Sequence, residues 1–596
     1  MSNLTKTMRQ NAKNSRLPSN HSNASVNRAG GVAFEIQDPA LKLVTMTGGS
    51  FYAEPKFYNG DVIVPKRSSK AGRGSDLRGK FSALAKRLEI VDGKLDSFMS
   101  CDELDDIARE VVATALDVAN GDNPEDLLAI ARWLRNDAYI RLTPQVLLVV
   151  ASRVDATKPF VRKYAPHIAV RPDEIKTCLL LHRFFFGMKS LSNSLAWGLT
   201  DTLGKFNEAS FLKYNSSAYP TWKDVLCVLP SKKGHKRMQS ELAHYLISGE
   251  VVDATKTPVV AARKELAKRK KFDAKSKELA VTSKVNWEVL LSQFGKTDGT
   301  AVWEHLLNNN LVGYMALLRN LRNLLEAGVN QSVIDRVVTT LADPKEVVRS
   351  KQLPFRFLMA HRVLQAHFSG YGHGGNALQV SQMLEAIETA SNLAVDNVPV
   401  LPGLTVVFAD NSGSMNCQVS AKSQMTCAGA ANSIAGIVGK RAEQAIVCAF
   451  GDTVAPVAFT KHDTVISIAE KVQRAQCGWS TNGHKIPLWL EANGLKPDRV
   501  IVLSDMQAYN RCLSGRPLCD NWHTYTNRLS PKTWLHTIHL NGSGDSPVDE
   551  GKRINQLSGF SEKVISMLLQ TEGGGGNSSE NSLPAVEQVR KDWYLD

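Results

Sequence analysis

The chain has 596 residues and a mass of 65.4 kDa, which is too long for one hydrophobic core, so we expect several domains. Hydrophobic residues make up 43% of the chain and charged residues 22%, as in ordinary globular proteins. No apolar run reaches about 18 residues, and the first 30 residues are polar, which argues against a membrane span and a secretory signal.

The net charge of +14 is unevenly distributed. Residues 396–596 contain 18 Lys and Arg against 19 Asp and Glu, which leaves an excess of +15 in residues 1–395. We therefore expect a polyanion to bind the first two-thirds of the chain. The nine cysteines form no CxxC pair, which favours reduced thiols and a cytoplasmic location.

Residues 1–30 are rich in Asn and Ser and are predicted to be a flexible tail. Beyond residue 80 the apolar residues recur at helical spacing, and in 103–120 one face would carry Leu104, Ile107, Val111, Ala115 and Val118. Helix starts are predicted where Asn123, Thr143 and Asp343 each precede a proline. We predict an all-α module of HEAT-like repeats over 31–395, with an irregular bundle as the alternative because no clean period is visible.

The pattern changes near residue 396. Apolar strands now alternate with amphipathic helices, which predicts a doubly wound α/β domain over 396–570 with sites at the carboxyl ends of its strands. Residues 571–596 are predicted to be a Gly/Ser linker and a tail, in which Val586, Val589 and Trp593 would form an apolar stripe. The predicted strands are 404–410, 443–451, 498–505 and 534–542.

A polar loop follows the first strand of this domain. Asp410, Ser412 and Ser414 supply one carboxylate and two hydroxyls in a tight Gly-containing turn, a set of hard oxygen donors that suits Mg²⁺. The alternative is that the serines only cap the next helix. A catalytic triad of Asp410 and Ser412 with His462 or His484 is less favoured, because no G-x-S-x-G elbow is present.

Thr481 lies in a later loop and Asp505 ends a later strand. In this order, the DxSxS loop, the threonine and the strand-end aspartate resemble the metal-ion-dependent adhesion site of von Willebrand factor A domains. The resemblance implies Mg²⁺ held directly by Ser412 and Ser414, with Thr481, Asp410 and Asp505 bound directly or through water, and a partner carboxylate completing the shell. Asn482 departs from the family, which often has Asp there.

A zinc site is one interpretation of three residues in the α/β domain. Cys512 and Cys519 lie near His523 in the sequence, but their spacing matches no common zinc pattern, so structural cysteines are favoured.

Basic runs are concentrated in the helical region and predict contacts to RNA phosphates. Aromatic residues near them, such as Trp222, would stack on unpaired bases, or else belong to the core. The candidate RNA-binding residues are Lys213, Trp222, Lys223, Lys232, Lys233, Lys236, Arg237, Arg263, Lys264, Lys268, Arg269, Lys270 and Lys271.

Five stretches follow one another along the chain: "NRAGGVAFEIQDPALKLVTMTGGSFY" (27–52), "LKYNSSAYPTWKDVLCVLP" (212–230), "MALLRNLRNL" (315–324), "PFRFLMAHRVL" (354–364) and "LTVVFADNSGSM" (404–415). In this order they resemble the Ro ribonucleoprotein autoantigen family, a TROVE module followed by a von Willebrand A domain, and a bacterial or phage-type member is expected. Lys213, Lys223 and Asp224 match the family, whereas Trp222 replaces a histidine and Ser216 and Ser217 replace basic residues.

The resemblance implies a helical ring closed by the metal-site domain, and no catalysis. It further implies a small noncoding Y-like RNA on the outer surface, single-stranded RNA ends in the central hole, and in bacteria sometimes an exoribonuclease as partner. The alternative is a protein-interaction scaffold whose Mg²⁺ site captures a carboxylate, with the basic runs incidental. An enzyme acting on phosphodiesters is disfavoured because a second acidic cluster for a two-metal site is missing.

Overall fold

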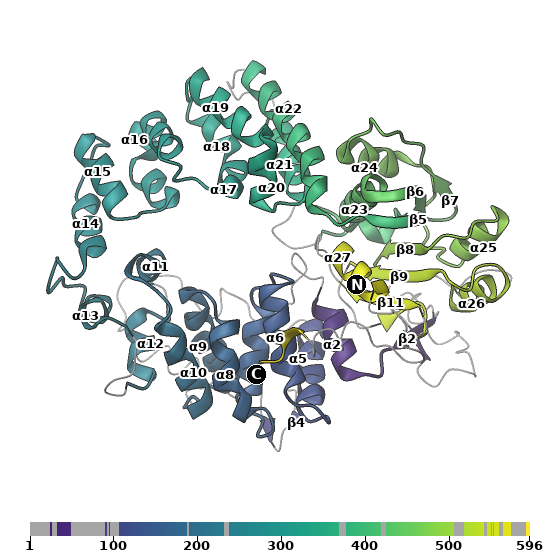
Figure 1. Ribbon diagram of the computed structural model, residues 1–596, viewed down its shortest axis with the longest axis horizontal. Coiled ribbons are helices and arrows are strands. Elements are labelled where there is room, and N and C mark those ends of the chain that lie inside the picture. Colours follow the sequence, from purple (N-terminus) through teal and green to yellow (C-terminus); the bar gives the residue numbers. More distant parts are fainter. Residues whose placement is uncertain are drawn as a thin grey trace, which may run out of the picture. The chain divides into compact units, whose positions relative to one another are not determined.

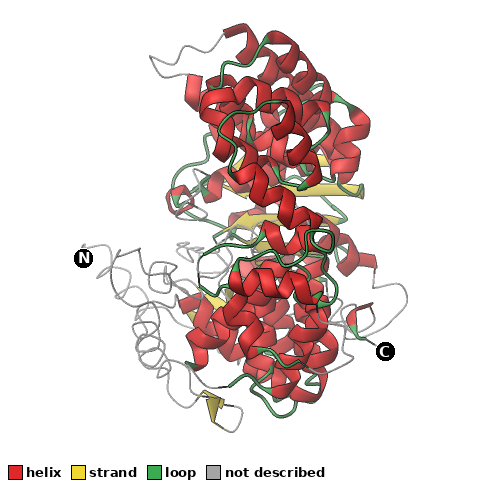
Figure 2. Cartoon of the chain, turned by 90° about the vertical axis from the view of Figure 1, so that its left-hand side faces the viewer, coloured by secondary structure: helices red, strands yellow, loops and turns green. Residues whose placement is uncertain are grey.

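The computed structural model describes residues 24–26, 32–48, 90–91, 94–95, 106–187, 190–217, 219–231, 238–368, 377–418, 425–505, 518–540, 545–549, 551, 553–558, 564–573 and 592–595. Helices make up most of this part of the chain, and strands are few (Figure 2). Among the described helices, none combines the length and the apolar character needed to cross a membrane.

The region between residues 106 and 393 is helical, as predicted (Figure 1). Val111, Ala115 and Val118 are buried on one face of the first of these helices, in agreement with the predicted stripe. The helices are α5 (Asp106–Ala119), α6 (Asp126–Asn136), α7 (Thr143–Ala151), α8 (Lys158–Ile168), α9 (Pro172–Phe186), α10 (Asn193–Leu203), α11 (Glu208–Lys213), α12 (Trp222–Val228), α13 (Ser240–Ser248), α14 (Pro258–Ala267), α15 (Ala274–Thr282), α16 (Trp287–Asn308), α17 (Tyr314–Arg319), α18 (Leu321–Glu326), α19 (Gln331–Ala342), α20 (Pro344–Ser350), α21 (Pro354–Phe368) and α22 (Ala377–Leu393).

Local helix signals were accurate in two places and misleading in two. Asp343 caps α20 through the amide of Lys345, and α7 carries its proline in the first turn, as predicted. The start predicted at Asn123 is wrong, because Glu125 is the N-cap of α6 and residues 124–125 form a turn. Residues 313–328 have a helical pattern in the sequence but form two helices, because the helix breaks at Asn320, whose side chain donates to the carbonyl of Ala316 at 2.7 Å.

The α/β domain has a six-stranded sheet in the order β11-β9-β8-β5-β6-β7, parallel except for the edge strand β7. The chain enters the sheet at its middle and winds outward in both directions, as a doubly wound fold does. Its switch point lies between β5 and β8. The strands are β5 (Leu401–Asp410), β6 (Ala442–Phe450), β7 (Val454–Pro456), β8 (Arg499–Ser504), β9 (Trp534–His539) and β11 (Ile554–Ser558).

Helices cover both faces of this sheet. Val406, Phe408 and alternate residues of the neighbouring strands share a core with Leu490 of α25 and Trp522 of α26. The other face meets α23, where a Cβ on Gly439 would lie 3.1 Å from Val447. Sheet residues buried on both faces account for the near-continuous apolar strands in the sequence. The helices are α23 (Cys427–Arg441), α24 (Val465–Arg474), α25 (Lys485–Ala492), α26 (Leu518–Arg528) and α27 (Val564–Gly573).

The N-terminal segment packs on the α/β domain rather than on the helical module. β1 (Ala24–Val26) pairs with β2 (Val32–Glu35), β2 pairs with β10 (Asp545–Ser546), and Phe34 enters the core of the α/β domain. α2 (Pro39–Thr47) follows, and its Thr45 donates to the carbonyl of Gln556 at 3.2 Å. Residues 24–26, expected in a flexible tail, are therefore in a sheet.

The chain divides into two compact units. One comprises residues 1–55, 341–366 and 384–591, and the other residues 56–340, 367–383 and 592–596. These limits differ from the boundaries predicted at residues 30 and 395, because the N-terminal segment and part of the last helices group with the α/β domain. A helical region followed by an α/β domain is confirmed, whereas closure into a ring stays a prediction.

A short hairpin, β3 (Ile90–Val91) with β4 (Lys94–Leu95), completes the described strands.

Candidate metal centre and nucleic-acid interface

The loop after β5 collects polar side chains at the end of a buried strand. Asp410 is fully buried, and its Oδ1 accepts the amide of Ser412 at 2.8 Å. The hydroxyls of Ser412 and Ser414 lie 3.2 Å apart, with Ser412 buried and Ser414 exposed. Three oxygen donors thus stand together at one edge of the sheet.

The adjoining strand tip adds a second carboxylate. Ser504, the last residue of β8, donates to Asp410 Oδ2 at 2.6 Å, and the buried Asp505 follows it directly. This places the acidic cluster at the switch point, where doubly wound sheets bind ligands. Burial, and to a lesser degree the charge of Asp505, raises the pKa of Asp410 to about 7. Two buried carboxylates without a cation are electrostatically costly, which is the condition that a divalent ion relieves.

The loop carrying Thr481 is attached to the first loop through the backbone. The amide of Gly413 donates to the carbonyl of Trp479 at 2.9 Å, and Thr481 itself is buried. A Cβ on Gly451 would lie 2.6 Å from the carbonyl oxygen of Gly478, so only glycine permits this close approach of β6 to the loop. Gly478 itself has a φ of +87°, a left-handed backbone conformation that favours glycine at that position.

Asn482, which stands where von Willebrand factor A domains often have Asp, holds its loop through two hydrogen bonds. Its amide donates to the carbonyl of Gly451 at 3.0 Å and its side chain to that of Asp452 at 3.3 Å. The structure thus joins the loop of Thr481 to the loop of Asp410 through the backbone and places Asp505 next to Ser504, which contacts Asp410. A metal ion held by Asp410, Ser412, Ser414, Thr481 and Asp505 stays a prediction. These carboxylates and hydroxyls are hard oxygen donors and fit Mg²⁺ better than a thiophilic metal.

The basic run 261–277 separates into two kinds of side chain. Three lysines in the turn between α14 and α15 are exposed and form no hydrogen bond or ion pair through their side chains with the described residues; they are Lys268, Lys270 and Lys271. Such side chains are available to phosphates without breaking internal contacts.

Three other basic residues of that run have internal partners. Arg263 donates to the carbonyls of Ser283 and Lys284 at 3.3 Å, which caps the end of α15. Lys264 donates to the carbonyl of Gly249 at 2.9 Å, and Arg269 pairs with Asp273. These contacts give the three residues structural roles, and RNA contact by them stays a prediction.

The stretch around α12 gives a mixed result. Trp222 is fully buried, with its ring edge-on to Phe211 at 5.0 Å and Lys176 Nζ 5.2 Å from its centroid, so it cannot stack on a base and the core alternative holds. Lys223 is exposed, and Lys213 Nζ lies 5.5 Å from the ring of Tyr214. Lys232, Lys233, Lys236 and Arg237 fall outside the described residues.

Two family models match the chain. The TROVE domain matches residues 256–370, which include the α14–α15 turn. The Ro60 vWA domain matches residues 405–517, which include the oxygen-rich cluster of Asp410, Ser412, Ser414, Thr481 and Asp505. The chain is therefore similar to Ro proteins in two separate segments. Asn482 lies within the second match, whereas the buried Trp222 lies outside the first.

Curated relatives are similar to parts of this chain. The RNA-binding protein RO60 of Deinococcus radiodurans is 29% identical over 216 residues, which are 35% of the chain and 40% of the relative. RO60 of Caenorhabditis elegans is 28% identical over 275 residues, 45% of the chain and 36% of the relative. Telomerase protein component 1 of mouse is 25% identical over 379 residues, 55% of the chain and 14% of the relative. The chain therefore spans well under half the length of these relatives in each match.

A solved structure extends the comparison to the fold. The crystal structure of the Deinococcus radiodurans Ro protein superposes with a TM-score of 0.60 and covers 82% of this chain and 98% of its own, at 19% identity. The two proteins share the helical region and the α/β domain as a fold.

Proposed function

We propose that this chain binds RNA through its helical region, with the exposed lysines of the α14–α15 turn contacting phosphates. The observation that carries the proposal is that the TROVE match, residues 256–370, contains these lysines in a part of the chain with a strong basic excess. Two relatives with which the chain shares sequence are named RNA-binding proteins, which supports the same assignment.

Phosphate contacts explain the chemistry of this surface better than base recognition does. Lysine ammonium groups are point charges that pair with phosphate oxygens and release counterions, without reading sequence. Trp222, the aromatic residue predicted to stack on a base, is buried, so we do not include it among the RNA contacts. The remaining proposed contacts are Lys213, Lys223, Lys232, Lys233, Lys236, Arg237, Arg263, Lys264, Lys268, Arg269, Lys270 and Lys271.

The RNA we propose is a small noncoding, Y-like RNA, together with single-stranded ends of structured or misfolded RNAs. The protein would then serve in RNA quality control or as an RNA-processing adaptor, and binding rather than catalysis is its proposed activity. Mg²⁺ in the α/β domain would supply an electrophilic contact for a carboxylate of a protein partner, such as an exoribonuclease.

The test removes three charges that support nothing else in the described structure. The variant Lys268→Ala, Lys270→Ala and Lys271→Ala is titrated with fluorescein-labelled RNAs of unrelated sequence, by anisotropy, at a series of salt concentrations. We expect weaker binding to every RNA, and a slope of log affinity against log salt that is smaller by about 2, since each phosphate contact to a single strand contributes roughly 0.7.

The matched control removes three exposed lysines of the α/β domain, Lys461, Lys496 and Lys532. It changes the net charge equally and should leave both affinity and slope close to wild type. Equal losses in the two variants would show only a general charge effect. Unchanged binding in the first variant would exclude the α14–α15 turn as the interface.

A second function, docking of a protein partner at the metal loop, is favoured by one observation. Trp479 is 77% exposed, and a Cβ on Gly413 would touch its ring at 3.5 Å, so a large apolar side chain stands beside the oxygen-rich cluster. Exposed tryptophans commonly anchor protein interfaces. Here Trp479→Ala should abolish capture of the partner while leaving RNA affinity unchanged, as measured in pull-down and anisotropy experiments with the same preparation.

A further inference from the structure

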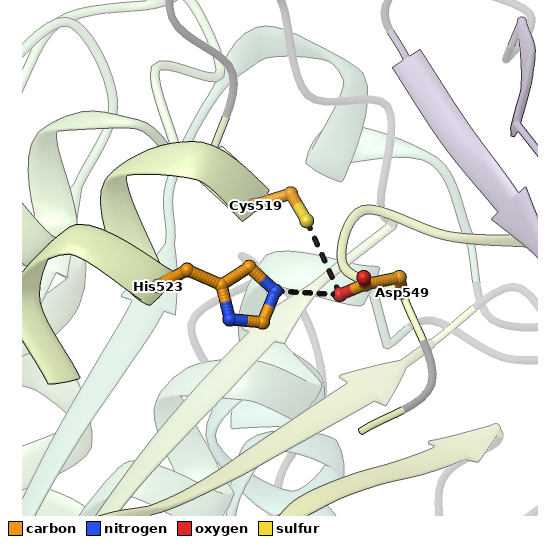
Figure 3. A group of neighbouring side chains, drawn as sticks. All are labelled: Cys519, His523 and Asp549. Atoms are coloured by element: carbon orange, nitrogen blue, oxygen red, sulfur yellow. Dashed lines mark hydrogen bonds and ion pairs between the residues drawn. The ribbon is translucent and has the colours of Figure 1, made fainter. Parts of the chain in front are cut away.

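Three side chains of different chemistry meet on the α/β domain, apart from the oxygen-rich cluster. Cys519 and His523 lie four residues apart on α26, and Asp549 lies in the segment after β10 (Figure 3). Asp549 Oδ1 is 3.2 Å from the sulfur of Cys519 and 2.8 Å from Nε2 of His523. One donor atom from each of the three residues lies within 4.8 Å of the other two.

We propose that Cys519, His523 and Asp549 form a zinc site with one coordination position open to solvent. A thiolate, an imidazole and a carboxylate are the protein ligands that Zn²⁺ takes, and three of them with one water is a common zinc arrangement. This proposal does not depend on RNA binding or on the Mg²⁺ site, because it uses none of their residues.

The geometry is close to what a bound ion requires. Donors held tetrahedrally around zinc at its usual bond lengths are separated by about 3.4–3.6 Å. The two measured separations are shorter, so the side chains would move apart by roughly half an ångström to admit the ion. Residues four apart on a helix lie on one face, so Cys519 and His523 can turn toward a common point without unwinding α26.

Charge and solvent access agree with this site. The thiol of Cys519 is buried, whereas the side chains of His523 and Asp549 are 40% and 15% exposed. One thiolate and one carboxylate balance the two charges of Zn²⁺, so a partly buried complex would carry no net charge. The exposed imidazole edge leaves a path for water, or for a small thiol or anionic ligand, to the fourth position.

A cysteine-nucleophile triad is the other chemistry these residue types suggest, and the contacts disfavour it. Such a nucleophile is activated by a hydrogen bond to a histidine. Here Cys519 donates to Asp549, and His523 contacts the same carboxylate oxygen. Burial raises the pKa of the Cys519 thiol, which keeps it protonated unless a metal displaces the proton.

The test uses the full-length protein after removal of metals with a chelator. Co²⁺ is added as a spectroscopic substitute, and Zn²⁺ affinity is measured by competition with a chromophoric chelator. We expect one equivalent of Co²⁺ to give tetrahedral d–d bands and a thiolate-to-cobalt charge-transfer band, and Zn²⁺ to displace it.

The variants assign the signal. Cys519→Ser should remove the charge-transfer band. His523→Ala and Asp549→Asn should each lower the affinity for Zn²⁺ by more than about 100-fold, because replacing even a residue that only contacts a ligand lowers metal affinity about 10–100-fold. The matched control is Cys227→Ser, an exposed thiol elsewhere, which should change nothing. His523→Ala keeps the test valid if replacement of the buried cysteine impairs folding.

Two results would overturn the proposal. In one, the wild-type protein binds neither Co²⁺ nor Zn²⁺ above the level of nonspecific thiol binding. In the other, it binds one equivalent that survives in both His523→Ala and Asp549→Asn, which would place the ion at other residues.

Discussion

At the scale of single residues, Asp410 combines complete burial with a negative charge. Its carboxylate accepts hydrogen bonds from Ser504 and from the amide of Ser412, yet its pKa is raised because burial and Asp505 oppose ionisation. A residue in this condition favours a bound cation over an empty site. The carboxylate therefore costs folding stability when no ion is bound and supplies binding energy when one is.

Asp410→Asn is predicted to abolish Mg²⁺ binding in calorimetry, because a hard cation loses its local counter-charge. Without divalent ions at pH 8, the same change should raise the free energy of unfolding, on the order of 2–4 kcal/mol, since an ionised buried carboxylate is removed. RNA affinity should stay unchanged. Retention of Mg²⁺ binding, or loss of RNA binding from a folded variant, would contradict the assignment of the two activities to separate domains.

At the scale of elements, α27 is attached to the sheet by one partly buried carboxylate. Glu572 accepts from Arg499 of β8 at 2.7 and 2.6 Å and from His536 of β9 at 2.9 Å. Burial lowers the pKa of His536, so the ring is neutral and its second nitrogen accepts from Asn555 at 3.1 Å. Burial alone would raise the pKa of Glu572, but the hydrogen bonds from His536 and Arg499 outweigh it and lower the pKa.

Glu572→Gln is predicted to destabilise the α/β domain by about 2–3 kcal/mol at pH 7, because Arg499 keeps its charge and loses its counterion. A carboxyl with a lowered folded-state pKa stabilises above its unfolded pKa, and that contribution is lost as pH falls through the folded value. The difference in the free energy of unfolding between variant and wild type should therefore shrink as the pH falls below about 4.3, the ordinary pKa of a glutamic acid carboxyl. Urea titrations of variant and wild type at several pH values measure this difference in the free energy of unfolding.

The control for this experiment is Glu491→Gln, which breaks the more exposed pair with Arg528 at 3.1 Å. A pair of this kind is worth no more than about 1 kcal/mol. An equal effect of the two substitutions would mean that the buried cluster adds nothing beyond a surface ion pair.

At the scale of the whole molecule, the C-terminal residues 592–595 contact α6 and α8, and Arg132 and Trp593 are 461 residues apart in the chain. Arg132 of α6 donates to the carbonyls of Trp593 and Tyr594 at 2.9 and 3.2 Å, and its guanidinium lies 5.3 Å from the centroid of the Trp593 ring. The hydroxyl of Tyr594 donates to Asp126 at 2.5 Å. These contacts fasten the segment to the helical unit, while Val586 and Val589 of the predicted stripe lie outside the described residues.

Deletion of residues 592–596 is predicted to loosen α6 and α8, because several hydrogen bonds and a cation–π contact are lost, together worth about 1–3 kcal/mol. Hydrogen exchange of the amides in residues 126–136 and 158–168 should accelerate, and that of α23 should not. Arg132→Ala should produce much of the same change, and adding it to the deletion should have little further effect. Fully additive effects would show that the two do not act together.

Much of this architecture follows from local sequence signals. Helical periodicity and prolines in the first turn located α7 and α20, and apolar strands ending in polar residues located β5 and β8 with Asp410 and Asp505 at their tips. These predictions succeed because capping and periodicity act over a few residues, and because parallel strands expose their carboxyl ends at one edge.

Tertiary structure alone decided what depends on contacts between distant residues. It buried Trp222, gave Arg263 carbonyl partners on the next helix, and left Lys268 exposed, although all three belong to stretches that looked equally available in the sequence. It also brought Asp549 to Cys519 and His523, a cluster hidden from spacing rules because its third member comes from another element. Burial and convergence are properties of packing, and a pattern read along one segment carries no information about the segment that will cover it.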